Sequence, residues 1–125
     1  MADEKGSDNI VKVELAKSER DATLEVIAFF IQLAEYDAQY KKLKTQRKYA
    51  KQKAKYLDKV FDRVKSNTLR EKDILTIISL LDKFIYGSKK EKIEGLTHAG
   101  YRYRVRDILP YMKTKEKFQD ALNIP

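Results

Sequence analysis

The amino-acid sequence predicts an all-α protein from two observations. Neither glycine nor proline occurs between Gly6 and Gly87, so this long part of the chain lacks the two residues that most often end helices. Apolar residues recur there at alternating steps of four and three, which is the spacing of a heptad seam on one face of a helix. This apolar seam consists of Ala22, Val26, Phe29, Leu33, Tyr36, Tyr40, Leu43, Ala50, Ala54, Leu57, Phe61 and Val64, with Arg47 as its one charged position.

The length of 125 residues predicts a single domain. Residues 1–9 are polar and predict a disordered tail, so we expect the folded part to span residues 10–125. Apolar and polar residues alternate in residues 10–16, which is typical of a short strand, and residues 101–106 are the only candidate for its partner. A helix capped by Asn9 is an equal alternative.

Residues 19–65 predict helix, with Ser18 as the N-cap. The seam permits either one continuous, coiled-coil-like helix or a helical hairpin whose two helices meet near residues 44–48. We favour the continuous helix, or one that is only gently broken, because the seam keeps its spacing throughout. The turn at residues 26–31 is apolar on every face, and so long a seam is hard to bury in one small chain. We therefore expect a homodimer through residues 22–64.

Arg47 interrupts the seam with a charge, and three roles are open to it. Its long stem allows the guanidinium to reach the edge of the seam. It can also pair with Glu35 or Asp37 of an antiparallel partner chain, or reach a phosphate. Pairing across the dimer is the role that we favour.

Residues 68–125 predict a C-terminal module of three to four helices. Thr68 and Glu71 have the spacing of a capping box, and the wide apolar face that follows predicts a core helix. We expect Gly87 to end this helix, and a short helix to follow over residues 89–96.

The end of the module permits a functional interpretation. Residues 101–106, with the sequence YRYRVR, fit either a helix or a strand, and we favour the helix. Pro110 ends that element or begins the last helix, residues 111–122. Residues 69–109 have the order of elements of a helix-turn-helix motif, in which a short second helix enters the major groove of DNA. On this interpretation the side chains at the DNA are Arg102, Tyr103 and Arg106, with Lys89, Lys90 and Lys92 near the DNA backbone.

The net charge of +8 is distributed unevenly. Residues 1–40 contain 4 basic and 9 acidic side chains, residues 41–65 contain 11 and 2, and residues 66–125 contain 12 and 8. Between Lys41 and Lys55 there are eight basic residues and no acid. The basic excess of the middle segment exceeds the acidic excess before it, so the first helix can neutralise it only in part.

Placed on a helix, the basic residues of the middle segment form one stripe, roughly 120° from the apolar seam. Lysines at i and i+4, such as Lys44 and Lys48, repel each other by about 0.2–0.5 kcal/mol when no counter-charge is near. Phosphates are the commonest counter-charge of such arrays. Tyr49 and Tyr56 lie away from the seam, where they can stack on bases or cover lysine stems. The lysine stripe consists of Lys41, Lys44, Lys48, Lys51, Lys55 and Lys59.

These patterns predict a non-enzymatic nucleic-acid-binding protein that acts as a homodimer, with DNA favoured over RNA and with no cofactor or small-molecule substrate. The main alternative is a helical interaction subunit or inhibitor that docks on an acidic partner within a nucleoprotein assembly. A filament or coat subunit is a third possibility. The residues expected to contact nucleic acid are Lys41, Lys44, Arg47, Lys48, Lys51, Lys55, Lys59, Lys89, Lys90, Arg102, Tyr103, Arg104 and Arg106.

Other function classes have little support in the residues. The lack of cysteine excludes disulfides and thiol catalysis, and the single histidine, His98, leaves no Ser/His/Asp set and no Cys/His zinc cluster. We therefore expect no metal site. The most apolar run, residues 24–34, is shorter than the roughly 20 residues of a membrane span. The expected location is the cytoplasm or the nucleoid.

Overall fold

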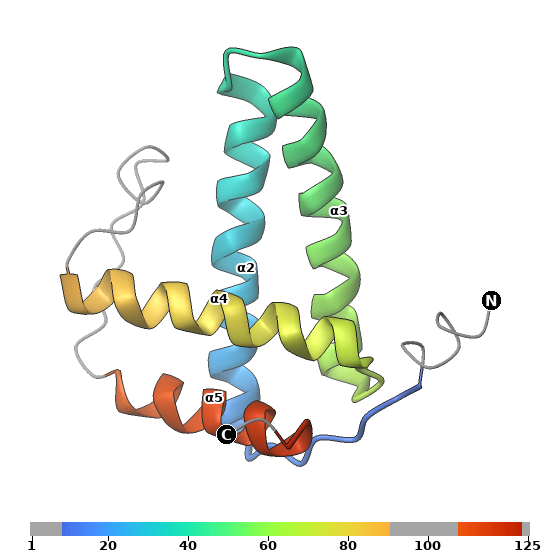
Figure 1. Cartoon of the computed structure of the whole chain (residues 1–125), viewed down its shortest axis with the longest axis vertical. Helices are drawn as coiled ribbons and strands as arrows, with labels where there is room; N and C mark the ends of the chain where they lie inside the picture. Colours follow the sequence, from blue (N-terminus) through green and yellow to red (C-terminus); the bar gives the residue numbers. More distant parts are fainter. Residues whose placement is uncertain (1–8, 91–107, 124–125) are drawn as a thin grey trace.

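The computed structural model describes residues 9–90 and 108–123, and this part of the chain is all-helical, as predicted. Its four helices are α2 (Lys17–Tyr40), α3 (Lys44–Ser66), α4 (Glu71–Lys90) and α5 (Leu109–Ala121). Helices α2 and α3 run antiparallel as a long hairpin, and α4 and α5 cross this hairpin in the half away from its turn (Figure 1). We call the hairpin the arm, residues 41–43 its tip, and the half crossed by α4 and α5 its base.

The arm is the hairpin alternative, and the continuous helix that we favoured is wrong. The backbone of Lys41 leaves the helix with φ −63° and ψ 143°, and α3 begins at Lys44. Nη1 of Arg47 donates hydrogen bonds to the carbonyl oxygens of Lys41 (2.7 Å) and Lys42 (3.0 Å). These carbonyls lie between the two helices, beyond the regular hydrogen bonding of either. Arg47, the charged residue that interrupts the seam, therefore stabilises the turn that reverses the chain.

Folding back brings the two halves of the apolar seam against each other. Val26 of α2 and Leu57 of α3 are almost completely buried, whereas near the tip Tyr40 is 64% exposed and Leu43 is 58% exposed. The seam is thus covered within one chain along the base and opens toward the tip. The burial argument for a homodimer through residues 22–64 no longer applies, because that argument required a seam with nothing to cover it.

The core lies at the base, where α4 and α5 pack on the arm. Phe84 of α4 and Phe118 of α5 are fully buried, and the ring of Phe84 meets that of Phe29 edge-on at 5.7 Å. The buried hydroxyls of Thr23 and Thr114 donate to carbonyl oxygens one turn back in their own helices, at 2.8 and 2.7 Å. Throughout the described ranges, every buried side-chain nitrogen or oxygen has a hydrogen-bond partner. The base is therefore a packed and fully satisfied unit.

Residues 10–16 run as an extended segment that is neither of the expected elements, since they form no helix and the β-bridge between Ile10 and Arg70 is isolated. The N–H of Val11 donates to the carbonyl oxygen of Leu69 (2.7 Å), and the N–H of Val13 donates to Oδ1 of Asn67 (3.2 Å). Asn67 ends α3 in the left-handed conformation, with φ 53°, a position in which asparagine is well tolerated. The partner of the extended segment is thus the loop before α4. The partner that we expected, the YRYRVR segment, lies outside the described residues.

Both ends of α4 differ from the prediction. The capping box of Thr68 and Glu71 is wrong, because α4 begins at Glu71 and the carboxylate of Asp73 accepts the N–H of Arg70 (3.1 Å). A charged acceptor at this position makes the stronger cap. Gly87 does not end the helix, which continues for three more residues and ends at Lys90. Gly87 is buried and lines a groove between α4 and the arm, where it adds no side chain.

The other helix starts follow simple rules. Helix α2 begins at Lys17, so Ser18 lies inside it and is not the N-cap. Glu19 closes the N-terminus instead, by accepting the N–H of Ala16 at 2.8 Å. Pro110 lies in the first turn of α5, as its fixed φ and missing N–H predict.

The helix-turn-helix interpretation of residues 69–109 loses its first break. Helix α4 continues through Gly87 and over the first two residues of the expected short helix, residues 89–96. The remainder of that short helix, the turn and residues 101–106 lie outside the described residues.

Candidate nucleic-acid interface

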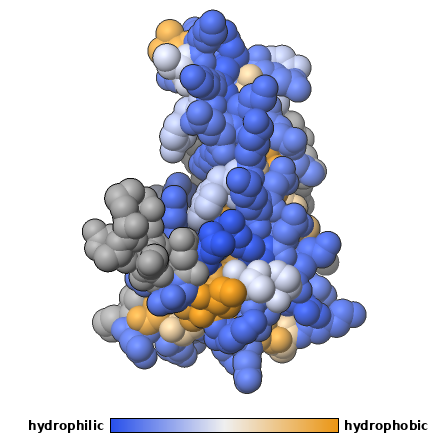
Figure 2. Space-filling model, turned by 90° about the vertical axis from the view of Figure 1, so that its right-hand side faces the viewer, coloured by the Kyte–Doolittle hydropathy of each residue, from blue (hydrophilic) through white to orange (hydrophobic). Residues whose placement is uncertain are grey.

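The lysine stripe lies on a solvent-exposed face of the arm. Five of its members belong to α3, and the sixth, Lys41, stands at the tip. All six side chains are exposed, and none of their ammonium groups makes an ion pair or hydrogen bond within residues 9–90 and 108–123. Figure 2 views the molecule from the side on which α3 lies, and hydrophilic residues cover most of the upper arm there. The stripe is therefore a positively charged surface open to solvent.

The acids of the N-terminal part do not neutralise the stripe. The carboxylate of Glu19 faces α5, 3.9 Å from Nζ of Lys117. Glu25 also faces α5, and it accepts the O–H of Tyr111 at 2.6 Å. Asp37 borders a groove beside the arm, which is described below. Glu19 and Glu25 thus face α5 and not the stripe, and no acid of α2 makes an ion pair with a stripe lysine in the part of the chain that the structure describes.

The excess of positive charge is largest toward the tip. The two acids of α3, Asp58 and Asp62, lie in its second half, and its first turn contains no acid. A cation at the N-terminus of a helix opposes the helix dipole, which costs about 0.3–1 kcal/mol. Lys44 carries this cost together with its repulsion from Lys48, about 0.2–0.5 kcal/mol. An anion bound near Lys44 would offset both costs.

Arg47 contacts the backbone of the tip, and the sequence pattern does not indicate this contact. Its half-buried side chain is directed at the carbonyl oxygens of Lys41 and Lys42. This contact within the chain takes the place of the predicted pairing with Glu35 or Asp37 of a partner. The missed signal was the position of the charge itself, because an arginine close behind a turn is well placed to donate hydrogen bonds to the carbonyl oxygens of that turn.

The two tyrosines of α3 have different surroundings. Tyr49 is 68% exposed and remains available to a ligand. Tyr56 donates its O–H to Oδ1 of Asp73 (2.9 Å), and Nζ of Lys72 lies 5.2 Å from the centre of its ring. Stacking on bases is therefore open to Tyr49 and closed to Tyr56.

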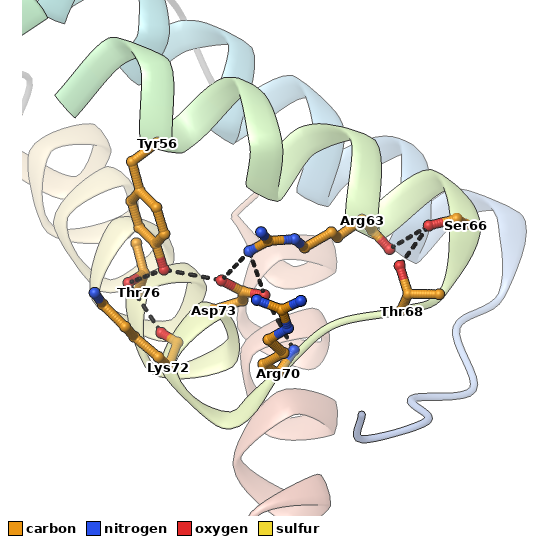
Figure 3. A network of polar contacts seen from close by, with 8 residues as sticks. All are labelled: Tyr56, Arg63, Ser66, Thr68, Arg70, Lys72, Asp73 and Thr76. Carbon is orange, nitrogen blue, oxygen red and sulfur yellow. Dashed lines mark hydrogen bonds and ion pairs between the residues drawn. The ribbon is translucent and has the colours of Figure 1, made fainter. Parts of the chain in front are cut away.

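Asp73 is the centre of a polar network that joins α3 to α4 (Figure 3). It is 1% exposed, and its carboxylate accepts from Nη1 of Arg63 at both oxygens (3.0 and 3.1 Å), from Tyr56 and from the N–H of Arg70. Burial, together with the bond to Asp73, raises the pKa of Tyr56 above its ordinary value of 10.0. A carboxylate with this many donors needs no ligand, so we assign the network to the stability of the base.

A groove beside the arm was not predicted from the sequence. It has a volume of about 760 Å³ and lies between the tip half of the arm and the C-terminal half of α4. Among the described residues that line it, the cations are Lys41, Lys53 and Lys83, and the acid is Asp37. No periodicity along the chain indicates such a site, because three separate helices form it.

The other predicted contacts cannot be placed. Lys89 and Lys90 are the last residues of α4, and their side chains lie outside the described part. Arg102, Tyr103, Arg104 and Arg106 lie outside the described residues as well.

Comparisons of the chain with protein-family models, with curated proteins and with solved structures find no match. In the parts of the chain that the structure covers, no group of three or more His, Cys, Asp and Glu side chains is arranged to hold a metal ion. None of the helices described above combines the length and the apolar character needed to cross a membrane.

Proposed function

We propose that the protein binds nucleic acid through the lysine stripe of the arm. The observation that supports this proposal is that none of the six exposed ammonium groups forms an ion pair with a carboxylate in the described structure. On α3, successive stripe lysines are three or four residues apart, which is about 4.5–6 Å along the helix axis. Each lysine can therefore contact a different phosphate of one bound strand.

The expected mode of binding follows from the chemistry of lysine. An ammonium group is a compact charge without the planar, forked geometry with which arginine reads a guanine. Contacts to phosphates position a protein on nucleic acid but carry no direct sequence information. The stripe is therefore suited to binding that tolerates many sequences. We expect DNA as the ligand, and competition between a DNA duplex and an RNA duplex of equal length tests that choice.

The first test is the salt dependence of binding. If about five phosphates are neutralised, log K should fall against log salt with a slope of about −4 to −5. Fluorescence anisotropy of a labelled DNA duplex between low and physiological salt measures this slope. A slope near zero contradicts the proposal and favours docking on a protein surface.

The second test locates the interface. Lys48, Lys51 and Lys55 lie off the apolar seam and are exposed, so changing all three to Glu should leave the fold intact and abolish binding. The matched control changes the exposed residues Lys17, Lys113 and Lys117 to Glu. This control has the same net charge as the first variant, but its changed residues lie at the base of the arm and not on the stripe. It should therefore retain most of the affinity. Equal losses in both variants would mean that the overall charge, and not the stripe, determines binding.

A further inference from the structure

The groove beside the arm has an apolar wall of the kind found in sites for organic ligands. Phe30, Leu33 and Ala34 of α2 and Ala50 of α3 contribute to this wall. Gly87 of α4 adds backbone without a side chain, which keeps the groove open on that side. The volume of about 760 Å³ lies in the range of roughly 300–1,000 Å³ that is typical of small-molecule sites, whose linings are mostly apolar with a few polar groups.

The polar groups of the groove are mainly cationic. Lys53 of α3 is half-buried there, and Lys83 of α4 and Asp37 of α2 also line the groove. Burial lowers the pKa of Lys53, the nearby charge of Lys83 lowers it further, and Asp37 only partly opposes these effects. No ion pair joins either lysine to Asp37 in the described structure. With Lys41, the described lining of the groove has three cations and a single acid, so its charge is positive on balance.

The rim of the groove carries two exposed aromatic side chains. Tyr49 is 68% exposed and Tyr86 is 63% exposed, and they project from α3 and α4 respectively. A tyrosine ring gives apolar contact area, and its hydroxyl keeps a polar edge in water. Such a rim suits a ligand that is apolar where it enters the groove and polar where it meets the lysines.

We infer that the groove binds a small organic anion, whose apolar part lies on Phe30 and Leu33 and whose charged group lies between Lys53 and Lys83. Charge complementarity decides the sign of the ligand, because a negative group relieves the repulsion between two lysines that have only one shared acid. The volume favours a small molecule over a peptide helix or a second chain. The inference does not depend on nucleic-acid binding, because Lys53 and Lys83 are not members of the lysine stripe. The groove and the stripe share only Lys41.

Titration of the full chain with decanoate tests the inference, with decanol as a probe of similar shape that lacks the charge. Isothermal calorimetry should show one decanoate site and a binding constant for decanol weaker by about tenfold or more, the loss expected for one charge-assisted hydrogen bond. Naphthalene-1-sulfonate serves as a second probe, which distinguishes a site for flat rings from a site for chains.

Two variants locate the binding site. Lys53→Met keeps an apolar stem of similar length without the charge, and Lys83→Gln removes the second cation. Each should weaken decanoate about tenfold or more. Lys72→Gln, at an exposed position of α4 outside the groove, is the matched control and should bind decanoate like the unchanged protein.

Three results would overturn the inference. The first is equal affinity for decanoate and decanol, and the second is unchanged decanoate affinity in both groove variants. The third is a dimer that Lys53→Met dissociates in sedimentation, because a second chain would then occupy the groove. The variant with Lys48, Lys51 and Lys55 changed to Glu separates the two proposals. It should lose nucleic acid and keep decanoate, so that either proposal can fail without the other.

Discussion

The base and the tip belong to the same helical hairpin, but among the described residues charged side chains form ion pairs at the base and not at the tip. At the base, the buried carboxylate of Asp73 is paired with Arg63, and Lys115 pairs with Asp82 at 2.8 Å. At the tip, the lysines stand in solvent with no acid against them, and Leu43 is exposed. The difference suggests a division of work. The base supplies the stability of the fold, and the tip can keep uncompensated cations because the fold does not depend on them.

The largest expected effect comes from the core of the base. Phe84→Ala removes a fully buried ring, and it should lower the free energy of unfolding by about 4 kcal/mol, the usual cost of such a cavity. Leu43→Ala at the tip should change it by less than about 0.5 kcal/mol. Urea unfolding followed by circular dichroism measures both. Similar losses for the two variants would contradict the division between base and tip.

The polar network of the base should be next in size. Asp73→Ala leaves Arg63, Tyr56 and the N-terminus of α4 without their acceptor, and we expect a loss of about 3 kcal/mol. Asp62→Ala, at an exposed position of α3, is the matched control and should be nearly neutral. If Asp73→Ala unfolds at the same urea concentration as the unchanged protein, the network is not what joins α3 to α4.

At the tip, Arg47→Ala should cost only about 1 kcal/mol, because its hydrogen bonds lie at the surface. The effect should be local, with faster amide exchange in the last turn of α2 and the first turn of α3. Amides of α5 should exchange as before. Arg47→Lys tests the geometry, since lysine keeps the charge but lacks the planar fork. Exchange that accelerates equally in all helices would show that the tip and the base unfold together.

The smallest effect concerns pH and the contact of α5 with the arm. Burial and the hydrogen bond to Glu25 raise the pKa of Tyr111 well above its ordinary value of 10.0. The raised pKa stabilises the folded state fully below pH 10, and this stabilisation is lost as pH rises above 10, where the unfolded state ionises first. The unfolding free energy of Tyr111→Phe should therefore fall less between pH 9 and pH 11 than that of the unchanged protein. Parallel pH profiles for the two proteins would contradict this assignment.

Much of the fold could be predicted from local patterns. The helical character of the seam and the place of Pro110 in the first turn of α5 both follow from the conformational preferences of neighbouring residues. The exposure of the lysine stripe follows from its angle to the seam, because the face that packs determines the face that remains outside. The predicted caps at Ser18 and Thr68 were wrong, since Glu19 and Asp73 perform that role from inside the helices.

The sequence by itself determined that this protein is helical, which face of its longest helical segment is apolar, and where its positive charge is concentrated. These properties depend on residues three or four positions apart, and such spacing is visible in a linear chain. Only the tertiary structure decided that the seam folds back on itself at Arg47, that Asp73 joins two helices, and that a cationic groove opens beside the arm. Each of these features depends on contacts between separate elements, and their free energy is set by burial and packing that no local pattern records.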